Sequence, residues 1–265
     1  MRDDLVAGRS FVGIESLIGT RLSTGPRERG STYDLATLDV EFLMRLLQDH
    51  PRLRSVYCVP EWTLCVRHGT HGLVLAPSRP CDGDDVVLSI RAGVLVTGLG
   101  TDSPRLWFPP TWQTSLATCR QNGTRFAIAN FGLYTDDELD LGHSNGLVFD
   151  LKHRRIERFE PAGPTSHDRL IRDLFRRRMP GWQYVDTSLP LQTQRTDSYH
   201  GMCVSFVIDF FLHRLLNPNL TSLAVQHMML RTPAQETRKR ILRLNATVLD
   251  RIAERESGRT LPEGS

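Results

Sequence analysis

The chain has 265 residues, of which 40% are hydrophobic and 24% charged, as in an ordinary globular protein of one large domain or two small ones. No apolar run approaches the roughly 18–20 residues that a membrane span requires. The N-terminus, MRDDLVAGRS, lacks the basic-then-apolar layout of a secretory signal. We therefore expect an intracellular protein with no membrane partner.

The five cysteines are irregularly spaced and form no CxxC pair. This pattern excludes a zinc ribbon and a thioredoxin motif. Cys58 and Cys65 lie among apolar residues, which favours small buried hydrophobic side chains over metal ligands. We expect no metal and no cofactor.

The net charge is +3, and its positive part is almost wholly arginine. Solvated helix faces explain the basic clusters most simply, and binding to nucleic acid or to an acidic partner is the alternative. The two clusters are Arg172, Arg176, Arg177 and Arg178, and Arg238, Lys239, Arg240 and Arg243.

The first half of the chain predicts a loose arm, one helix and several strands. Residues 1–33 are rich in Gly, Ser, Arg and Thr, and residues 36–48 carry apolar side chains at helical spacing. Within 55–67, Pro60 separates a short strand from a turn of helix. Further strands are predicted by β-branched residues and glycine breaks within 71–77, 85–98 and 125–134.

The second half predicts a β-hairpin followed mainly by helices. The hairpin strands are 146–150 and 155–159, joined by a tight turn near Leu151-Lys152. Helices are expected at 166–178, 204–216, 220–230 and from Thr232-Pro233 to about Glu254, with a short strand at 182–185. The tail, 256–265, is expected to fray. The order of elements indicates an α+β fold in one domain.

The stretch from Pro190 to Pro218 places Cys203 at the start of a strongly apolar helix. The unpaired N–H groups and positive dipole end of a helix N-terminus favour a thiolate. A thiolate nucleophile also needs a base, usually histidine, and the histidine needs an acceptor that orients its ring.

His143 and Glu160 stand at the two ends of the predicted hairpin. A turn centred on Leu151-Lys152 would put them directly opposite each other, with Cβ atoms about 5 Å apart, and would pair Leu147 with Ile156. A surface ion pair at a hairpin end is the alternative interpretation. Gln192 and Gln194 precede the cysteine, and either amide could join the Cys203 N–H in holding an oxyanion.

The order His143, Glu160, glutamine, Cys203 resembles that of the ubiquitin-like-protein (SUMO) proteases and the adenoviral protease. The segments that carry the resemblance are LDVEFLMRLLQ, HSNGLVFD, IERFEPAG and GMCVSFVIDFFLHRLLNP, which look most like a branch found in large DNA viruses. The acid is Glu, as in the adenoviral branch. Pro190-Leu191-Gln192 matches the family's Pro-x-Gln, so the resemblance favours Gln192.

The chain also departs from the SUMO-protease pattern. Ser144 stands where those enzymes usually carry Trp after the histidine, and Met202-Cys203-Val204 replaces Asp-Cys-Gly. Their glutamine lies closer to the cysteine than Gln192 does. These departures leave the triad intact but weaken the case for SUMO itself as the substrate.

The resemblance implies a papain-like or adenain-like cysteine protease domain at 34–255. It would have a central mixed sheet, the nucleophile at the N-terminus of a buried helix, and the catalytic set Cys203, His143, Glu160 and Gln192. The implied partner is a protein substrate such as a ubiquitin-like modifier, in the host cytoplasm or nucleus or in a virion. An aromatic wall of the substrate tunnel could come from Trp62, Trp107 or Trp112. The alternatives are an acyltransferase with the same triad and an inactive protein-binding module.

Overall fold

The computed structural model describes residues 37–60, 63–69, 72–75, 88–91, 93–135, 142–197 and 202–256. The predicted arm at 1–33 and all but the first residue of the tail at 256–265 lie outside these residues. In the described part of the chain, no helix combines the length and the apolar character needed to cross a membrane.

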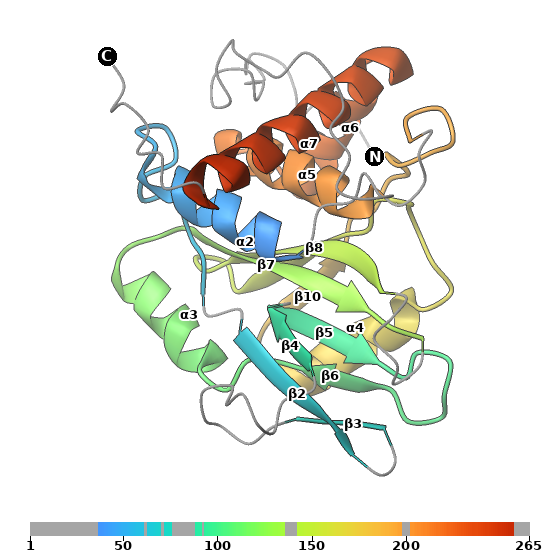
Figure 1. Ribbon diagram of the computed structural model, residues 1–265. Coiled ribbons are helices and arrows are strands. Elements are labelled where there is room, and N and C mark those ends of the chain that lie inside the picture. The colour runs from blue at the N-terminus through green and yellow to red at the C-terminus, as the bar shows by residue number, and fades with distance from the viewer. Residues whose placement is uncertain are drawn as a thin grey trace, which may run out of the picture.

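A mixed sheet forms the centre of the molecule (Figure 1). Its strand order is β10-β9-β8-β7-β5-β6, and the short β1 pairs with the beginning of β7. The pairs β7–β8, β8–β9 and β5–β6 are antiparallel, whereas β10 and β9, and β5 and β7, run parallel. The strands are β1 (Tyr57–Cys58), β5 (Val94–Thr97), β6 (Arg105–Trp107), β7 (Phe126–Leu133), β8 (His143–Asp150), β9 (Arg155–Phe159) and β10 (Gln183–Asp186).

A second sheet has the order β3-β2-β4. Its strands are β2 (Thr63–Gly69), β3 (Gly72–Leu75) and β4 (Leu88–Arg91). The predicted turn of helix after Pro60 is therefore wrong. The segment is instead a strand, because β3 and β4 pair with β2 from both sides and satisfy its backbone.

The helices cover both faces of the central sheet. They are α2 (Thr37–Leu46), which continues as a 3₁₀ turn (Leu47–Asp49), α3 (Trp112–Gln121), α4 (Asp168–Arg178), α5 (Cys203–Leu216), α6 (Ser222–Leu230) and α7 (Ala234–Glu256). Helix α3 was not predicted, and the other helices begin and end close to the predicted limits. The α+β class, the mixed sheet and a cysteine at the start of a buried helix are confirmed.

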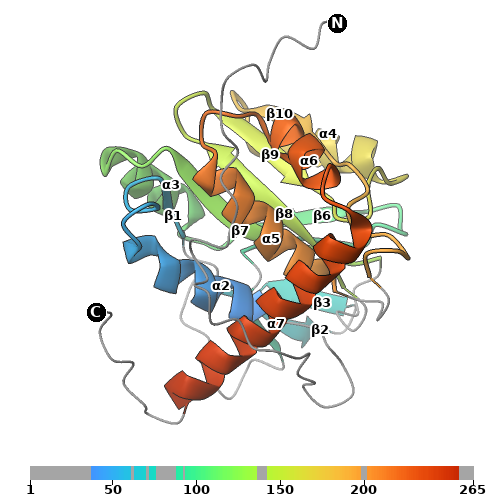
Figure 2. The ribbon, with the colours of Figure 1, turned by 90° about the horizontal axis from the view of Figure 1, so that it is seen from above.

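Helix α5 packs on one face of the sheet, together with α2, α6 and α7 (Figures 1 and 2). Every residue of α5 from Cys203 to Leu215 is buried. The helix comes so close to β8 that a Cβ atom on Gly146 would lie 3.0 Å from the ring of Phe211. On the opposite face, Phe131 of β7 contacts Phe175 of α4 at 5.5 Å between ring centroids.

The β8–β9 hairpin differs from its predicted register. Leu147 pairs with Arg158, and Phe149 pairs with Ile156. The loop contains the four residues from Leu151 to Arg154, and Asp150 Oδ1 accepts the N–H groups of Lys152 and His153 at 3.1 and 3.0 Å. The turn is thus centred one residue later than predicted, which moves each partner by two positions. A two-position shift leaves every side chain on its original face, because side chains alternate with period two.

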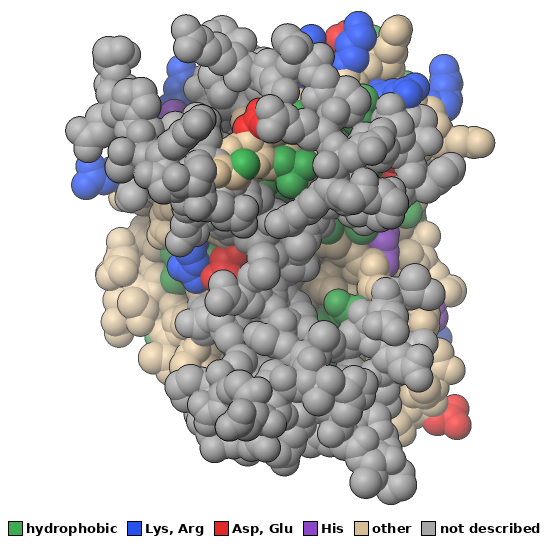
Figure 3. Space-filling view, in the orientation of Figure 1, with side chains coloured by type: hydrophobic (Ala, Val, Ile, Leu, Met, Phe, Trp, Pro, Cys, Tyr) green, Lys and Arg blue, Asp and Glu red, His purple; other side chains and the backbone are tan. Residues whose placement is uncertain are grey.

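The basic cluster on α7 is not simply a solvated face. Arg240 donates to both carboxylate oxygens of the fully buried Asp209, at 3.0 and 2.9 Å. His213 also lies 3.2 Å from Asp209. Burial would raise the pKa of Asp209, but the charges of His213 and Arg240 lower it to about 2. Lys239 and Arg243 are exposed, and lysine and arginine side chains gather at the top of the face in Figure 3.

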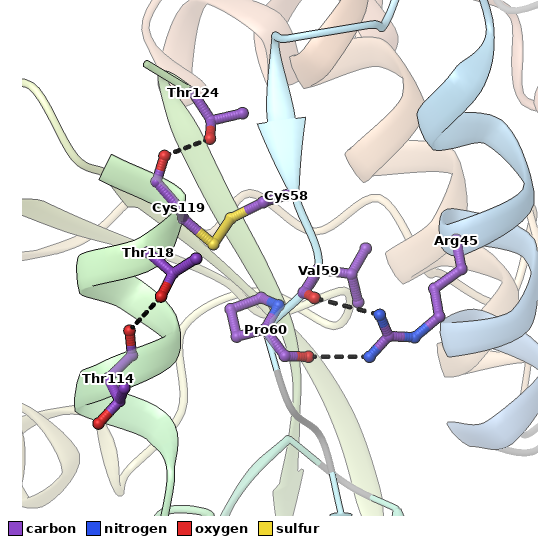
Figure 4. The surroundings of a disulfide bond; sticks show 8 residues. All are labelled: Arg45, Cys58, Val59, Pro60, Thr114, Thr118, Cys119 and Thr124. Carbon is purple, nitrogen blue, oxygen red and sulfur yellow. Dashed lines mark hydrogen bonds between the residues drawn. A yellow bond between two sulfur atoms is a disulfide. The ribbon is translucent and has the colours of Figure 1, made fainter. Parts of the chain in front are cut away.

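A disulfide joins Cys58 of β1 to Cys119 of α3 (Figure 4). Cys58 is buried as expected, but the prediction that it is a simple hydrophobic side chain is wrong. Beyond the disulfide, Arg45 of α2 donates to the carbonyl oxygens of Val59 and Pro60 at 3.3 and 3.1 Å. Disulfides persist mainly in oxidising compartments, so the pairing bears on the expected intracellular location, which stays a prediction.

Removal of this disulfide should destabilise the fold. It closes a loop of 61 residues, so the double variant Cys58→Ser/Cys119→Ser should lose about 2–4 kcal/mol of unfolding free energy. Urea unfolding under non-reducing conditions measures the loss. An unchanged wild-type midpoint after addition of reductant, with both thiols shown to be free, would contradict the expectation.

Candidate active site

Three of the predicted site residues meet where element ends approach one another. Cys203 is the first residue of α5, His143 is the first residue of β8, and Glu160 directly follows β9. His143 Nε2 lies 2.5 Å from Glu160 Oε1. The Cys203 side chain hydrogen-bonds to the same imidazole. Because Nε2 is taken by Glu160, Nδ1 is the ring nitrogen left for the sulfur.

The carboxylate of Glu160 is fully buried and hydrogen-bonded on both oxygens. Oε1 receives His143 Nε2 and the backbone N–H of Ala162, the latter at 3.0 Å. Oε2 accepts from Asn145 Nδ2 at 2.8 Å and from Arg158 Nη2 at 3.2 Å. A buried carboxylate needs such partners to remain charged, and together they fix the direction in which it faces the histidine.

Asn145 reaches Glu160 because of the observed hairpin register. Continued past the Gly146–Phe159 pair, that register places Asn145 opposite Glu160. His143 is then a diagonal neighbour on the same face, close enough for long side chains to meet. The predicted contact between His143 and Glu160 therefore forms through a different geometry from the one expected.

Arg158 is the buried cation of this network. Its Nε donates to Asn145 Oδ1 at 2.7 Å. Its Nη1 donates to Asp168 of α4 at 2.7 Å and to Asp186 of β10 at 3.3 Å. Arg158 thus ties the Glu160 carboxylate to a helix and to a neighbouring strand.

The pKa of His143 is strongly raised. Burial alone would lower it, but hydrogen bonds and charge interactions with Cys203 and Glu160 outweigh burial and raise the pKa from 6.5 to about 10. The ring is therefore an imidazolium at neutral pH. A cation in contact with the sulfur favours the thiolate form that acts as a nucleophile.

Tyr134 brings an aromatic ring close to the thiol. Burial, and then the negative charge of Cys203, raise the pKa of its phenol. The ring lies against Gly132 and Gly142, and a Cβ atom at either glycine would collide with it. Both positions therefore require glycine for this ring placement.

Gln192 is held beside the start of α5, whereas Gln194 is exposed. Gln192 Nε2 donates to Asp197 Oδ2 at 2.7 Å, and the N–H of Met202 donates to the same oxygen at 3.2 Å. The N–H groups of Leu191 and Gln192 both donate to the carbonyl of Pro161, the residue after Glu160. The loop is thus tied both to the acid and to the residue before Cys203.

The three tryptophans proposed as walls of a substrate tunnel lie in different parts of the chain. Trp112 of α3 packs on Phe149 near the far end of β8, so the suggestion that it walls the tunnel is wrong. Trp107 of β6 donates its Nε1–H to Thr97 Oγ1 at 3.1 Å. Trp62 lies outside the described residues. Ser144, at the position where SUMO proteases usually carry tryptophan, is buried and donates to Asn130.

Sequence reasoning missed Asn145, Arg158 and Tyr134. Asn145 could have been found from a correct hairpin register. Arg158 carried a weaker signal. It lies two residues after Ile156, on the same face of a strand whose last four residues are buried. Nothing in the sequence indicated that the ring of Tyr134 would lie on two glycines.

No protein-family model matches the chain, and no curated protein matches it significantly. Among solved structures, the Legionella pneumophila effector protein RavZ is 12% identical over 90% of this chain and 71% of its own, with a TM-score of 0.39. RavZ in complex with human LC3B matches with 11% identity, 98% and 81% coverage and a TM-score of 0.35. The SUMO protease Ulp1, with its catalytic cysteine oxidized to a sulfinic acid, matches with 12% identity, 53% and 64% coverage and a TM-score of 0.26. At these scores the likeness carries no weight for the chemistry, which rests on the geometry of the residues above.

Replacement of the buried arginine should be costly. Arg158→Met would leave the carboxylate of Glu160 without its fully buried cationic partner and should lower the unfolding free energy by about 3–5 kcal/mol. Arg172→Met is the matched control, because Arg172 also pairs with Asp186 but is 39% exposed, and it should cost less than about 1 kcal/mol. Equal losses for the two variants in urea unfolding would contradict this view of the network.

The ring of His143 should titrate far above the normal range. We expect its NMR resonances to report the imidazolium up to a midpoint near pH 10. Glu160→Gln and Cys203→Ser should each lower the midpoint, because each removes one of the partners that raise the pKa. A wild-type midpoint near 6.5 would show that the two contacts do not stabilise the protonated ring.

Proposed function

We propose that this protein is a cysteine peptidase that acts on a ubiquitin-like modifier or on a protein carrying one. The observation that carries the proposal is the chain of hydrogen bonds from Cys203 through His143 to the buried carboxylate of Glu160. A surface ion pair does not explain it, because the carboxylate has no exposure and its other contacts are all filled from within the fold.

In the proposed reaction the Cys203 thiolate attacks the carbonyl carbon of the scissile bond. The His143 imidazolium then gives its proton to the leaving amine, and a thioester links Cys203 to the acyl fragment. Water, deprotonated by His143, attacks the thioester and restores the thiol. Glu160 stays ionised throughout, orienting the ring and stabilising its positive charge.

The Cys203 N–H and the Gln192 amide would hold the oxyanion. An amide nitrogen carries two hydrogens, so Gln192 can keep its bond to Asp197 and direct the second hydrogen at the substrate. Gln192→Ala should lower kcat by about 10²–10³-fold, the range for loss of one oxyanion donor. Gln194→Ala, at an exposed position, should leave kcat unchanged, and equal effects of both variants would count against this role.

The substrate class is supported by the motif resemblance to ubiquitin-like-protein proteases. The predicted kinship with the branch found in large DNA viruses stays a prediction, as do the cellular location and the binding of nucleic acid.

Activity-based probes test the proposal directly. Ubiquitin, SUMO and LC3B bearing a C-terminal vinyl electrophile would be incubated with wild-type protein and with Cys203→Ala. We expect a covalent adduct with at least one probe at Cys203, mapped by mass spectrometry, and none with the variant. No adduct with any probe, in protein shown to be folded, would overturn the ubiquitin-like substrate class.

The histidine is tested with a matched pair of variants. His143→Ala should slow labelling by about 10²–10⁴-fold, the range for loss of a general base. His153→Ala removes an exposed histidine of the same hairpin, which pairs with Asp150, and should label as fast as wild type. Incubation with acetyl-CoA separates the acyltransferase alternative, because acetylation of Cys203 without probe labelling would favour a transferase.

A further inference from the structure

A cavity of about 600 Å³ lies between α3, the end of α4 and the β8–β9 turn. This volume is typical of a small-molecule site. Trp112 and Trp182, two of its lining residues, both contact Phe149 of β8. Phe149 is six residues along β8 from His143, which puts the cavity roughly 20 Å from the candidate active site. The cavity is therefore separate from the Cys203 site.

The walls combine apolar and polar surface in similar amounts. Phe108, Trp112 and Trp182 supply aromatic rings, and Leu116 and Met179 supply aliphatic surface. The Phe108–Trp112 and Trp112–Phe149 ring centroids are 5.8 and 5.3 Å apart, so the rings form one packed layer. An apolar or aromatic ligand body would be desolvated against it.

The charged groups of the cavity are all cationic. Arg120, Arg154 and Arg178 line it, and none of its described lining residues carries a carboxylate. The described part of the chain provides no ion pair for any of these three arginines. All three are exposed side chains, so the cavity offers solvated guanidinium donors to an incoming acceptor.

The indole ring of Trp112 lines the cavity, but its N–H has no accessible surface there. Trp112 is 2% exposed, and its Nε1 is buried without a hydrogen-bond partner in the described residues. A buried N–H left unpaired costs about 1–3 kcal/mol. Because this N–H is closed off, a ligand in the cavity would contact the indole ring of Trp112 rather than its N–H.

Arg154 occupies a backbone position that does not suit arginine. Its φ is 49°, in the left-handed region that favours glycine or asparagine. The conformation lets its carbonyl accept the N–H of Gln183 at 2.8 Å, a task that glycine would perform with less strain. We take this strain at Arg154 as one argument for a role of its side chain.

We propose that this cavity binds an amphiphilic organic anion. The apolar body of the ligand lies against Trp112 and Trp182. Its carboxylate or phosphate accepts from Arg154, Arg120 and Arg178, where charge-assisted hydrogen bonds are strongest. The site needs neither Cys203 nor the proposed peptidase activity, so the two proposals can fail independently.

The test uses the full-length protein and the fluorescent aromatic anion 1-anilinonaphthalene-8-sulfonate. We expect saturable binding that dodecanoate or dodecyl phosphate displaces and that neutral dodecanol does not. The better of the two displacers identifies a carboxylate or a phosphate as the preferred head group. The Trp112 indole N–H resonance should shift on addition of the same displacer.

Arg154→Gly is the decisive variant, because it removes the guanidinium while relaxing the backbone. It should weaken binding about 10-fold or more without loss of thermal stability. Arg177→Ala, an exposed neighbour on α4 that does not line the cavity, is the matched control and should bind as wild type does. Cys203→Ala should also bind normally.

Three results would overturn the proposal. Displacement by dodecanol as effective as by dodecanoate would show a purely apolar surface. Unchanged affinity in Arg154→Gly would show that the arginines serve only the fold, as Arg120 and Arg178 could do at the ends of their helices. Displacement by an acidic peptide but by neither amphiphile would assign the cavity to a protein partner.

Discussion

The buried charge of Glu160 is the constraint on which the site depends. A carboxylate without exposure remains ionised only if the fold supplies donors, and here they come from β8, β9 and the loop after β9. Arg158, the fully buried cation among them, requires Asp168 of α4 and Asp186 of β10. The orientation of one histidine ring thus draws on the whole edge of the sheet, which explains why so many charged residues are buried there.

Helix α5 supplies the other half of the site by a different kind of force. Its residues from Cys203 to Leu215 are buried, so hydrophobic packing against the sheet decides where its N-terminus lies. The sulfur is therefore positioned by apolar contacts and the histidine by a polar network. The two meet only because β8 and α5 both begin at the same end of the sheet, and the glycine at position 146 permits their close approach.

Much of this arrangement could be predicted from sequence, for reasons that particular residues make clear. The apolar run after Cys203 and the strands on either side of Leu151 are local patterns, and local patterns fix the elements. The pairing of His143 with Glu160 tolerated an error in the turn because the shift moved partners by an even number of positions. The same error in the turn hid Asn145, because the residue directly opposite Glu160 depends on the exact register. The disulfide from Cys58 to Cys119 joins residues 61 apart in sequence, a distance at which spacing carries no information about proximity.

The two ends of the β8–β9 hairpin are chemically opposite. At the end where β8 begins, donors surround the carboxylate of Glu160, and the chain itself supplies the cation that balances its charge. Around the cavity near the turn, Arg120, Arg154 and Arg178 present donors, and no described lining residue carries a carboxylate. A closed network suits catalysis, because every partner must hold one geometry through the reaction. An open set of donors suits binding, because an incoming acceptor then completes it. The difference between the two ends lies in whether the chain supplies the counter-charge.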